Sequence, residues 1–147
     1  VLKGLQYQKD LEKLAFNAGG RSQVAPAQRL TDFVEGRLSS SLNETSYQPG
    51  LNSSPMHSLL PKLIGSRLRK GFAAFGKKMH GYYTNEANII GVESRTSSPV
   101  NIPRKENLEH PEIEGLFPCG EGGGYAGGII SAAMDGERCA EAAIAKL

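Results

Sequence analysis

A glycine-rich stretch near the end of the sequence contains the residue types that allow the closest approach to a ligand. It runs Gly115-Leu-Phe-Pro-Cys-Gly-Glu-Gly-Gly-Gly-Tyr-Ala-Gly-Gly128 and leads into the small-residue segment 129–147. Glycines lack a Cβ, so the backbone can take positive φ and come close to a bound group. The first turn of a helix after such a loop presents unpaired N–H groups and the positive end of the helix dipole. We therefore expect a strand, a glycine loop and a helix whose start faces an anionic or electron-rich group.

The spacing Gly122-x-Gly124-x-x-Gly127 fits the dinucleotide-binding fingerprint. A complete βαβ unit also places an acidic residue about 20 positions further on, after a second strand. Glu141 stands at about that distance, but it falls inside the expected helix, and no second strand fits before Leu147. The pattern excludes an N-terminal Rossmann motif and favours a terminal β-loop-α unit. The alternative is a glycine-rich turn that only connects two packed elements.

A second polar cluster, Glu93-Ser-Arg-Thr-Ser-Ser98, lies between the β-type run 88–92 and the extended segment 99–103. Arg95 offers a fork of donors suited to a carboxylate or a phosphate, and Thr96 adds a hydroxyl. A polar cluster between two extended segments predicts a binding site. A solvated hairpin tip is the alternative that the sequence leaves open.

The charge of the chain argues against a general nucleic-acid binder, because 17 Lys and Arg against 15 Asp and Glu give a formal charge of only +2. Residues 62–83 nevertheless hold six basic residues and no acid. These are Lys62, Arg67, Arg69, Lys70, Lys77 and Lys78. A solvated helix face is favoured over a phosphate-binding surface for this segment.

Two cysteines and three histidines are present, and they form no metal-ligand motif. Cys119 and Cys139 are too far apart for a CxxC motif, so we expect packing roles and a reduced, cytoplasmic setting. No apolar stretch approaches the roughly 20 residues that span a bilayer, and no leader is visible. No membrane partner is expected.

Apolar spacing predicts the elements that must position these residues. Helices are expected over 4–18, from Pro26 to about Gly36, and from Leu59 to about Gly81, with a long loop at 39–55. The first half is therefore expected to be mainly helical. The residue pattern becomes typical of β-strands only after residue 85.

Three motifs together resemble the C-terminal portion of a family of bacterial FAD-dependent dehydrogenases, which are flavoproteins with two dinucleotide-binding folds. They are Glu93-Ser-Arg-Thr-Ser-Ser-Pro99, the glycine stretch through Ile129, and Pro26-Ala-Gln-Arg29. The resemblance implies an α+β fold. Residues 1–84 would be the helical part of an inserted or substrate domain, and residues 85–147 the C-terminal segment of the FAD-binding domain. The terminal β-loop-α unit would complete a Rossmann-like domain.

The resemblance also implies roles for particular residues. Gly120 and Glu121, followed by Gly122, would lie beside the ribityl chain of FAD, with the Glu121 carboxylate accepting a hydrogen bond from a ribityl hydroxyl. The helix start at Gly127, Gly128 and Ile129 would direct N–H groups at the pyrimidine edge of the flavin. Arg95 and Thr96 would lie near the isoalloxazine or the substrate. No side chain is identified as catalytic, because the flavin performs the hydride transfer.

One departure from the family pattern is large, since the N-terminal glycine fingerprint and its ribose-binding acid are missing. We therefore expect a C-terminal fragment of an FAD-dependent oxidoreductase, inactive alone, whose partners are the rest of its own polypeptide and a small-molecule substrate. NAD(P)H is a candidate electron donor. Two alternatives come from other classes: a helical binding module whose basic helix 62–78 holds nucleic acid or an acidic partner, and an oligomerisation domain. The lack of interleaved aromatic residues disfavours nucleic acid.

Overall fold

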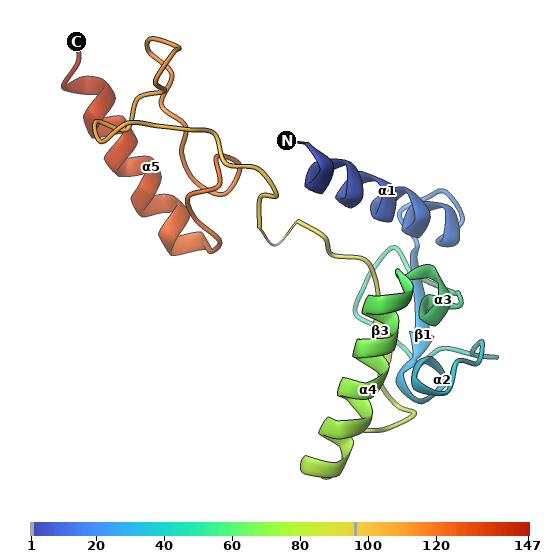
Figure 1. The fold of residues 1–147 in the computed structure, drawn as a ribbon. Coiled ribbons are helices and arrows are strands. Elements are labelled where there is room, and N and C mark those ends of the chain that lie inside the picture. Colours follow the sequence, from blue (N-terminus) through green and yellow to red (C-terminus); the bar gives the residue numbers. More distant parts are fainter. Residues whose placement is uncertain (1, 96) are drawn as a thin grey trace. The chain divides into compact units, whose positions relative to one another are not determined.

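A computed structural model describes residues 2–95 and 97–147 of the chain. Within these residues five helices and one three-stranded sheet form an α+β fold, which confirms the expected fold class at that level (Figure 1). The elements in chain order are α1 (Lys3–Ala18), β1 (Ala25–Arg29), α2 (Leu30–Glu35), β2 (Leu51–Ser53), α3 (Met56–Leu59), α4 (Lys62–Lys78), β3 (Asn88–Ile90) and α5 (Ile129–Ile144).

The chain divides into two compact units. Residues 10–93 form one, here called the sheet unit. Residues 1–9 together with 94–147 form the other, here called the glycine-loop unit. The boundary falls within α1, so this helix contributes residues to both.

The sheet has the strand order β2-β1-β3, with β1 parallel to β2 and antiparallel to β3. Its central strand corrects the prediction of a helix that begins at Pro26, because Ala25–Arg29 is extended. Pro26 has no N–H to donate, and its carbonyl accepts the Gly91 N–H at 3.3 Å. Proline is therefore accommodated in a central strand, a place that it rarely occupies.

The motif Pro26-Ala-Gln-Arg29 is structural in this fold. The side chain of Gln28 is fully buried. Its amide nitrogen donates to the Arg37 carbonyl and lies within hydrogen-bond distance of the His57 ring. The backbone N–H of His57 donates to Gln28 Oε1 at 3.1 Å. Arg29 donates to the Ser41 carbonyl at 2.7 Å. Burial, and then the nearby Arg69 charge, lower the pKa of His57, which keeps its ring neutral in this network.

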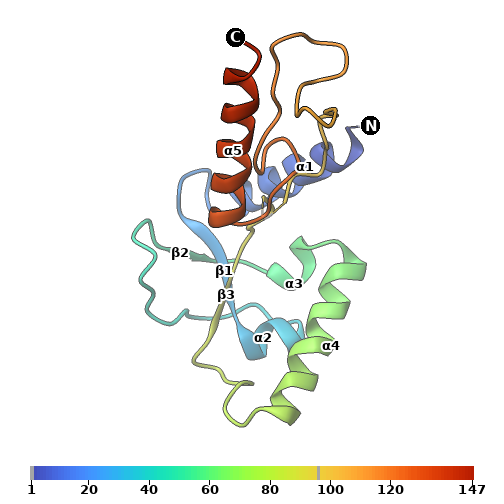
Figure 2. The ribbon, with the colours of Figure 1, turned by 90° about the vertical axis from the view of Figure 1, so that its left-hand side faces the viewer.

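The core of the sheet unit lies where the helices meet β1. In both views α4 runs beside α2 and α3 (Figures 1 and 2). Phe33 and Met56 are almost fully buried, and Phe72 of α4 meets the Phe33 ring edge-on at 5.9 Å between centroids. Aromatic burial of this kind supplies much of the stability of a small core.

Two of the expected helices are confirmed with small shifts at their ends. α1 ends at Ala18, and the following Gly20 takes a φ of 93°. α4 covers Lys62–Lys78 and ends before Gly81. The helix expected from Pro26 to about Gly36 is reduced to α2, although it ends as expected with Gly36 in the left-handed conformation. The long loop expected at 39–55 contains one short strand, β2.

The glycine-loop unit contains α5, which confirms the helix expected after the glycine loop. The strand expected before the glycine loop is not formed, since the described backbone at residues 115–119 is irregular. A strand needs a neighbour for its N–H and C=O groups, and no described strand lies beside this segment.

Candidate functional site

Residues 120–124 form a tight turn at the centre of the glycine-loop unit. The Gly124 N–H donates to the Glu121 carbonyl and the Tyr125 N–H to the Gly120 carbonyl, both at 3.0 Å. Gly120 and Gly124 take φ values of 65° and 85°, a region that side chains disfavour. The turn places the side chain of Glu121 at its exposed tip.

A buried ion pair fixes this turn to α5. Asp135 of α5 accepts two hydrogen bonds from Arg104, at 2.7 and 3.0 Å, and a third from the Gly120 N–H at 2.9 Å. The Arg104 and Asp135 side chains are 11% and 8% exposed. Arg104 also donates to the Pro118 carbonyl at 3.0 Å and lies over the Tyr125 ring at 3.6 Å. One guanidinium therefore joins the residues on both sides of the turn to α5.

The electrostatics of this cluster favour the charged forms. The hydrogen bonds from Arg104 and from the Gly120 N–H lower the pKa of Asp135, against the opposing effect of burial. The hydrogen bond to Asp135 raises the pKa of Arg104. Both groups are therefore ionised at neutral pH, and neither can act as an acid or base near pH 7.

The segment that follows the polar cluster runs beside the turn. The Ile102 N–H donates to the Gly123 carbonyl at 3.0 Å, and the Asn101 amide donates to the Gly124 carbonyl at 3.2 Å. A Cβ on Gly124 would lie 2.6 Å from the Val100 carbonyl oxygen. Glycine at position 124 therefore permits the close contact between the two motifs.

Three of the expected site residues share one hollow in this unit. Arg95, Glu121 and Gly122 line a space of about 400 Å³, whose other described lining residues are Leu5, Gln8, Lys9, Ser97, Ser98, Pro99 and Val100. Gln8 of α1 closes one side by donating to the Ser94 and Ser97 carbonyls, at 2.5 and 3.3 Å. Thr96, the remaining expected residue of the polar cluster, lies outside the described residues.

Other expected residues do not line this hollow. Gly127 and Gly128 precede α5, and the Gly128 N–H is taken by the Ser131 hydroxyl at 3.2 Å. Ile129 begins the helix and is 89% exposed. Gly120 contributes its N–H to Asp135 instead of to the hollow. The structure thus separates the helix start from the Glu121 hollow.

The sequence prediction missed Arg104 and Asp135, the two residues that hold the turn. The segment 104–114 is rich in charged residues, which is typical of an exposed connection, yet the Arg104 side chain is only 11% exposed. One signal was available: Asp135 is the only charged residue among the first eight residues of α5, which are otherwise small or apolar. A carboxylate on the packed side of such a helix needs a cationic or N–H partner.

The basic segment forms helix α4, and one of its cations is used internally. Arg69 donates to the Val34 carbonyl at 2.7 Å, which joins α4 to α2. Lys62, Arg67, Lys70, Lys77 and Lys78 are exposed. Most of the basic residues therefore lie on a solvated face.

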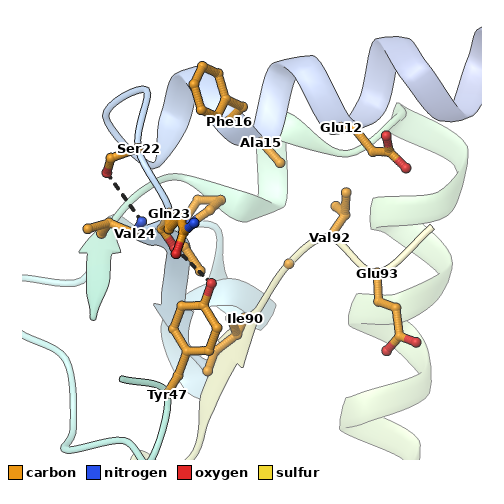
Figure 3. Close-up of a pocket in the computed structure, with 13 residues that line it drawn as sticks. Glu12, Ala15, Phe16, Ser22, Gln23, Val24, Tyr47, Ile90, Val92 and Glu93 are labelled. Atoms are coloured by element: carbon orange, nitrogen blue, oxygen red, sulfur yellow. Dashed lines mark hydrogen bonds between the residues drawn. The ribbon is translucent and has the colours of Figure 1, made fainter. Parts of the chain in front are cut away.

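A second hollow, of about 510 Å³, lies in the sheet unit between the end of α1, the start of β1 and the end of β3 (Figure 3). Phe16, Val24 and Ile90 give it an apolar lining, and the carboxylates of Glu12 and Glu93 lie at its border. The hydroxyl of Tyr47 donates to the Gln23 carbonyl at 2.8 Å and so fixes one wall.

The described residues contain neither a cluster of metal-binding side chains nor a helix that could span a membrane. Across 2–95 and 97–147, no group of three or more His, Cys, Asp or Glu side chains is placed to hold a metal ion. Within the same residues, no helix has the length and apolarity to cross a membrane.

Comparison with known proteins supplies the wider context. A protein of Clostridium beijerinckii, described as uncharacterized, is 42% identical over an alignment of 147 residues that covers 99% of this chain. The chain spans 28% of the length of that relative. Residues 1–96 match the family described as FAD-dependent protein, C-terminal domain-like, and the match includes the buried Pro26–Arg29 motif. Since about two thirds of its residues match, the chain belongs to this family of C-terminal domains of FAD-dependent proteins.

Proposed function

We propose that this chain forms the ribityl and isoalloxazine side of the FAD site in a flavin-dependent oxidoreductase of the dehydrogenase type. The family supplies the association with FAD, and the matched residues end before the glycine turn. The role of the turn is therefore argued from its geometry.

The observation that carries the proposal is the position of Glu121. It lies at the tip of a turn that is held by the hydrogen bond from the Gly120 N–H to Asp135, and it borders the same hollow as Arg95. The hydroxyl of Ser98, in the polar cluster, donates to the Gly122 carbonyl of the turn, 24 residues further along the chain, at 3.4 Å. A carboxylate carried on a fixed turn and a guanidinium at the same hollow can orient a ligand that carries both hydroxyls and electron-rich oxygens.

The described residues fit the proposed cofactor in a further respect. A Cβ on Gly122 would meet nothing within 4 Å, so the backbone beside Glu121 is open to a bound group. Flavin, when bound, supplies the hydride chemistry, and the residues of this chain would bind and orient it. Arg104 and Asp135 would keep the turn rigid, so that little conformational entropy is lost on binding.

A titration of FAD into the complete apoprotein tests the role of Glu121. Glu121→Gln removes the charged acceptor, and we expect the dissociation constant of FAD to rise by about tenfold or more, since hydrogen bonds to charged groups contribute about 1.5–3 kcal/mol. Glu141→Gln, an exposed change on α5, is the matched control and should leave the affinity unchanged. Equal FAD affinity in the wild type and Glu121→Gln would contradict the proposal.

A further inference from the structure

Cys119 and Cys139 lie on the two elements that the ion pair joins. Cys139 is on α5, one turn beyond Asp135, and is 3% exposed. Its Sγ lies 3.8 Å from the Pro118 carbonyl oxygen and 3.3 Å from a guanidinium nitrogen of Arg104. Cys119 follows Pro118 directly in the chain and is exposed. The buried sulfur is therefore adjacent to the backbone that carries the exposed one.

The surroundings of Cys139 change the pKa of its thiol. Burial raises the pKa of the Cys139 thiol, and the charge of Arg104 opposes this effect. Asp135 and then the neighbouring Cys119 raise the pKa further. Cys139 is therefore protonated in the reduced protein, with a cation beside it that stabilises its thiolate when it forms.

We propose that Cys119 and Cys139 form a reversible disulfide that links the glycine turn to α5. This differs from the expectation that both thiols only pack. The pair has the arrangement of an exposed attacking thiol and a buried resolving thiol, and it needs no residue outside the glycine-loop unit.

The chemical steps balance with a small disulfide such as oxidised glutathione as the oxidant. The Cys119 thiolate attacks one sulfur of glutathione disulfide, which forms a mixed disulfide and releases one glutathione thiolate. The Cys139 thiol then loses its proton to solvent, and its sulfur attacks Cys119 Sγ. The bond between Cys119 and glutathione breaks and a second glutathione leaves. Two protein thiols are oxidised and one glutathione disulfide is reduced.

The disulfide would join the glycine turn to α5, the same two parts that the ion pair holds together. Cys119 precedes Gly120, whose N–H donates to Asp135, and Cys139 lies one turn further along α5. Oxidation would therefore add a covalent link beside a hydrogen-bonded one. The orientation of Glu121, two residues from Cys119, would be held in both redox states.

Peptide mapping of the complete protein tests the pair directly, because Arg138 lies between the two cysteines. After treatment with oxidised glutathione, blocking of free thiols and digestion with trypsin, residues 106–138 and 139–146 should appear as one linked species. The linked species should separate into two peptides on reduction with dithiothreitol. Recovery of the two peptides individually, each with a blocked thiol or a glutathione adduct, would overturn the proposal.

Two single variants give an independent measurement. Cys139→Ser removes the resolving thiol, so Cys119 should keep its glutathione adduct, whereas in the wild type that adduct should be lost as the disulfide forms. Cys119→Ser should leave the buried Cys139 unmodified under the same conditions. A stable adduct on Cys119 in the wild type at the level found in Cys139→Ser would refute the resolving role.

Discussion

Asp135 joins three parts of the glycine-loop unit through one carboxylate. It accepts hydrogen bonds from two nitrogens of Arg104 and from the Gly120 N–H while only 8% of its side chain is exposed. A charge removed from water to this extent is tolerated only when its partners satisfy it fully. The side chain therefore acts through the turn that it holds, and we expect its loss to affect every contact of that turn.

The variant Asp135→Asn tests this role. The amide leaves the Arg104 guanidinium without a counter-charge, and we expect the free energy of unfolding at pH 7 to fall by about 3 kcal/mol. Urea denaturation measures the change, with the exposed Glu137→Gln on the same helix as the control. A loss below about 0.5 kcal/mol would show that the pair adds little to stability.

The stability difference between the wild type and Asp135→Asn should disappear at acidic pH. The pKa of Asp135 in the folded protein is below its ordinary value, so the carboxylate contributes stability above the unfolded pKa of about 3.9. That contribution is lost as the pH falls through the folded pKa. The difference between wild type and Asp135→Asn should therefore be constant above about pH 5 and shrink below about pH 4.

At the scale of elements, the glycine turn and the segment 98–102 require each other. Gly124→Ala forces a side chain onto a φ of 85° and places its Cβ 2.6 Å from the Val100 carbonyl oxygen. We expect a loss of about 1–3 kcal/mol in unfolding free energy. Gly122→Ala, where a Cβ meets nothing within 4 Å, should change it by less than about 0.5 kcal/mol. Thermal or urea unfolding distinguishes the two, and equal effects would contradict the geometry.

Helix α4 offers a second matched pair of glycines. A Cβ on Gly76 would lie 2.4 Å from Tyr83 Cβ, so Gly76→Ala should displace the loop after the helix and destabilise the protein by about 1–3 kcal/mol. A Cβ on Gly71 meets nothing within 4 Å. Gly71→Ala should therefore stabilise the protein by up to about 1 kcal/mol, because alanine favours the helix. Opposite signs in urea denaturation are the expected result, and a loss in both would contradict it.

The periodic helices and β3, which falls in the predicted β-type run 88–92, could be predicted from sequence, whereas β1 and β2 could not. α1, α4 and α5 each carry a repeated spacing of apolar or small residues that belongs to the helix alone. β1 has no alternation, since it buries Gln28 beside Ala27 and holds a proline that is typical of a helix start. What makes it a strand is its pairing with β2 and β3, which are 22 or more residues away.

The part of the site that depends on local sequence was predicted, and the part that depends on contacts between distant residues was not. Glycines and a carboxylate in one short stretch indicate a turn and its exposed tip, so Glu121 and Gly122 could be named from local sequence. Arg104 and Asp135 act through a contact 31 residues apart, and nothing in the charged segment around Arg104 distinguishes it from a solvated cation. The lining of a hollow depends on contacts between residues that are distant in sequence, so only part of it could be predicted.

At the scale of the whole molecule, α5 has an apolar face without cover in the described chain. Ile129, Ile130 and Met134 are 89%, 72% and 58% exposed. Adjacent apolar side chains with this exposure are typical of a surface that another segment covers. Because the chain spans 28% of the length of its Clostridium relative, we expect the rest of the full-length protein to cover this face.

The three methionines of the chain can test that expectation, since each falls in a different tryptic peptide: 38–62, 79–95 and 106–138. Met56 is 1% exposed, Met79 45% and Met134 58%. In the isolated 147-residue chain, hydrogen peroxide should oxidise Met79 and Met134 quickly and Met56 slowly, as sulfoxide formation follows exposure. In the full-length protein Met134 alone should slow, by about tenfold or more, if another segment buries α5. Met56 reports whether the chain is folded, because its rapid oxidation would indicate unfolding. Equal Met134 rates in the two proteins, with Met56 protected in both, would show that this face of α5 stays open to solvent.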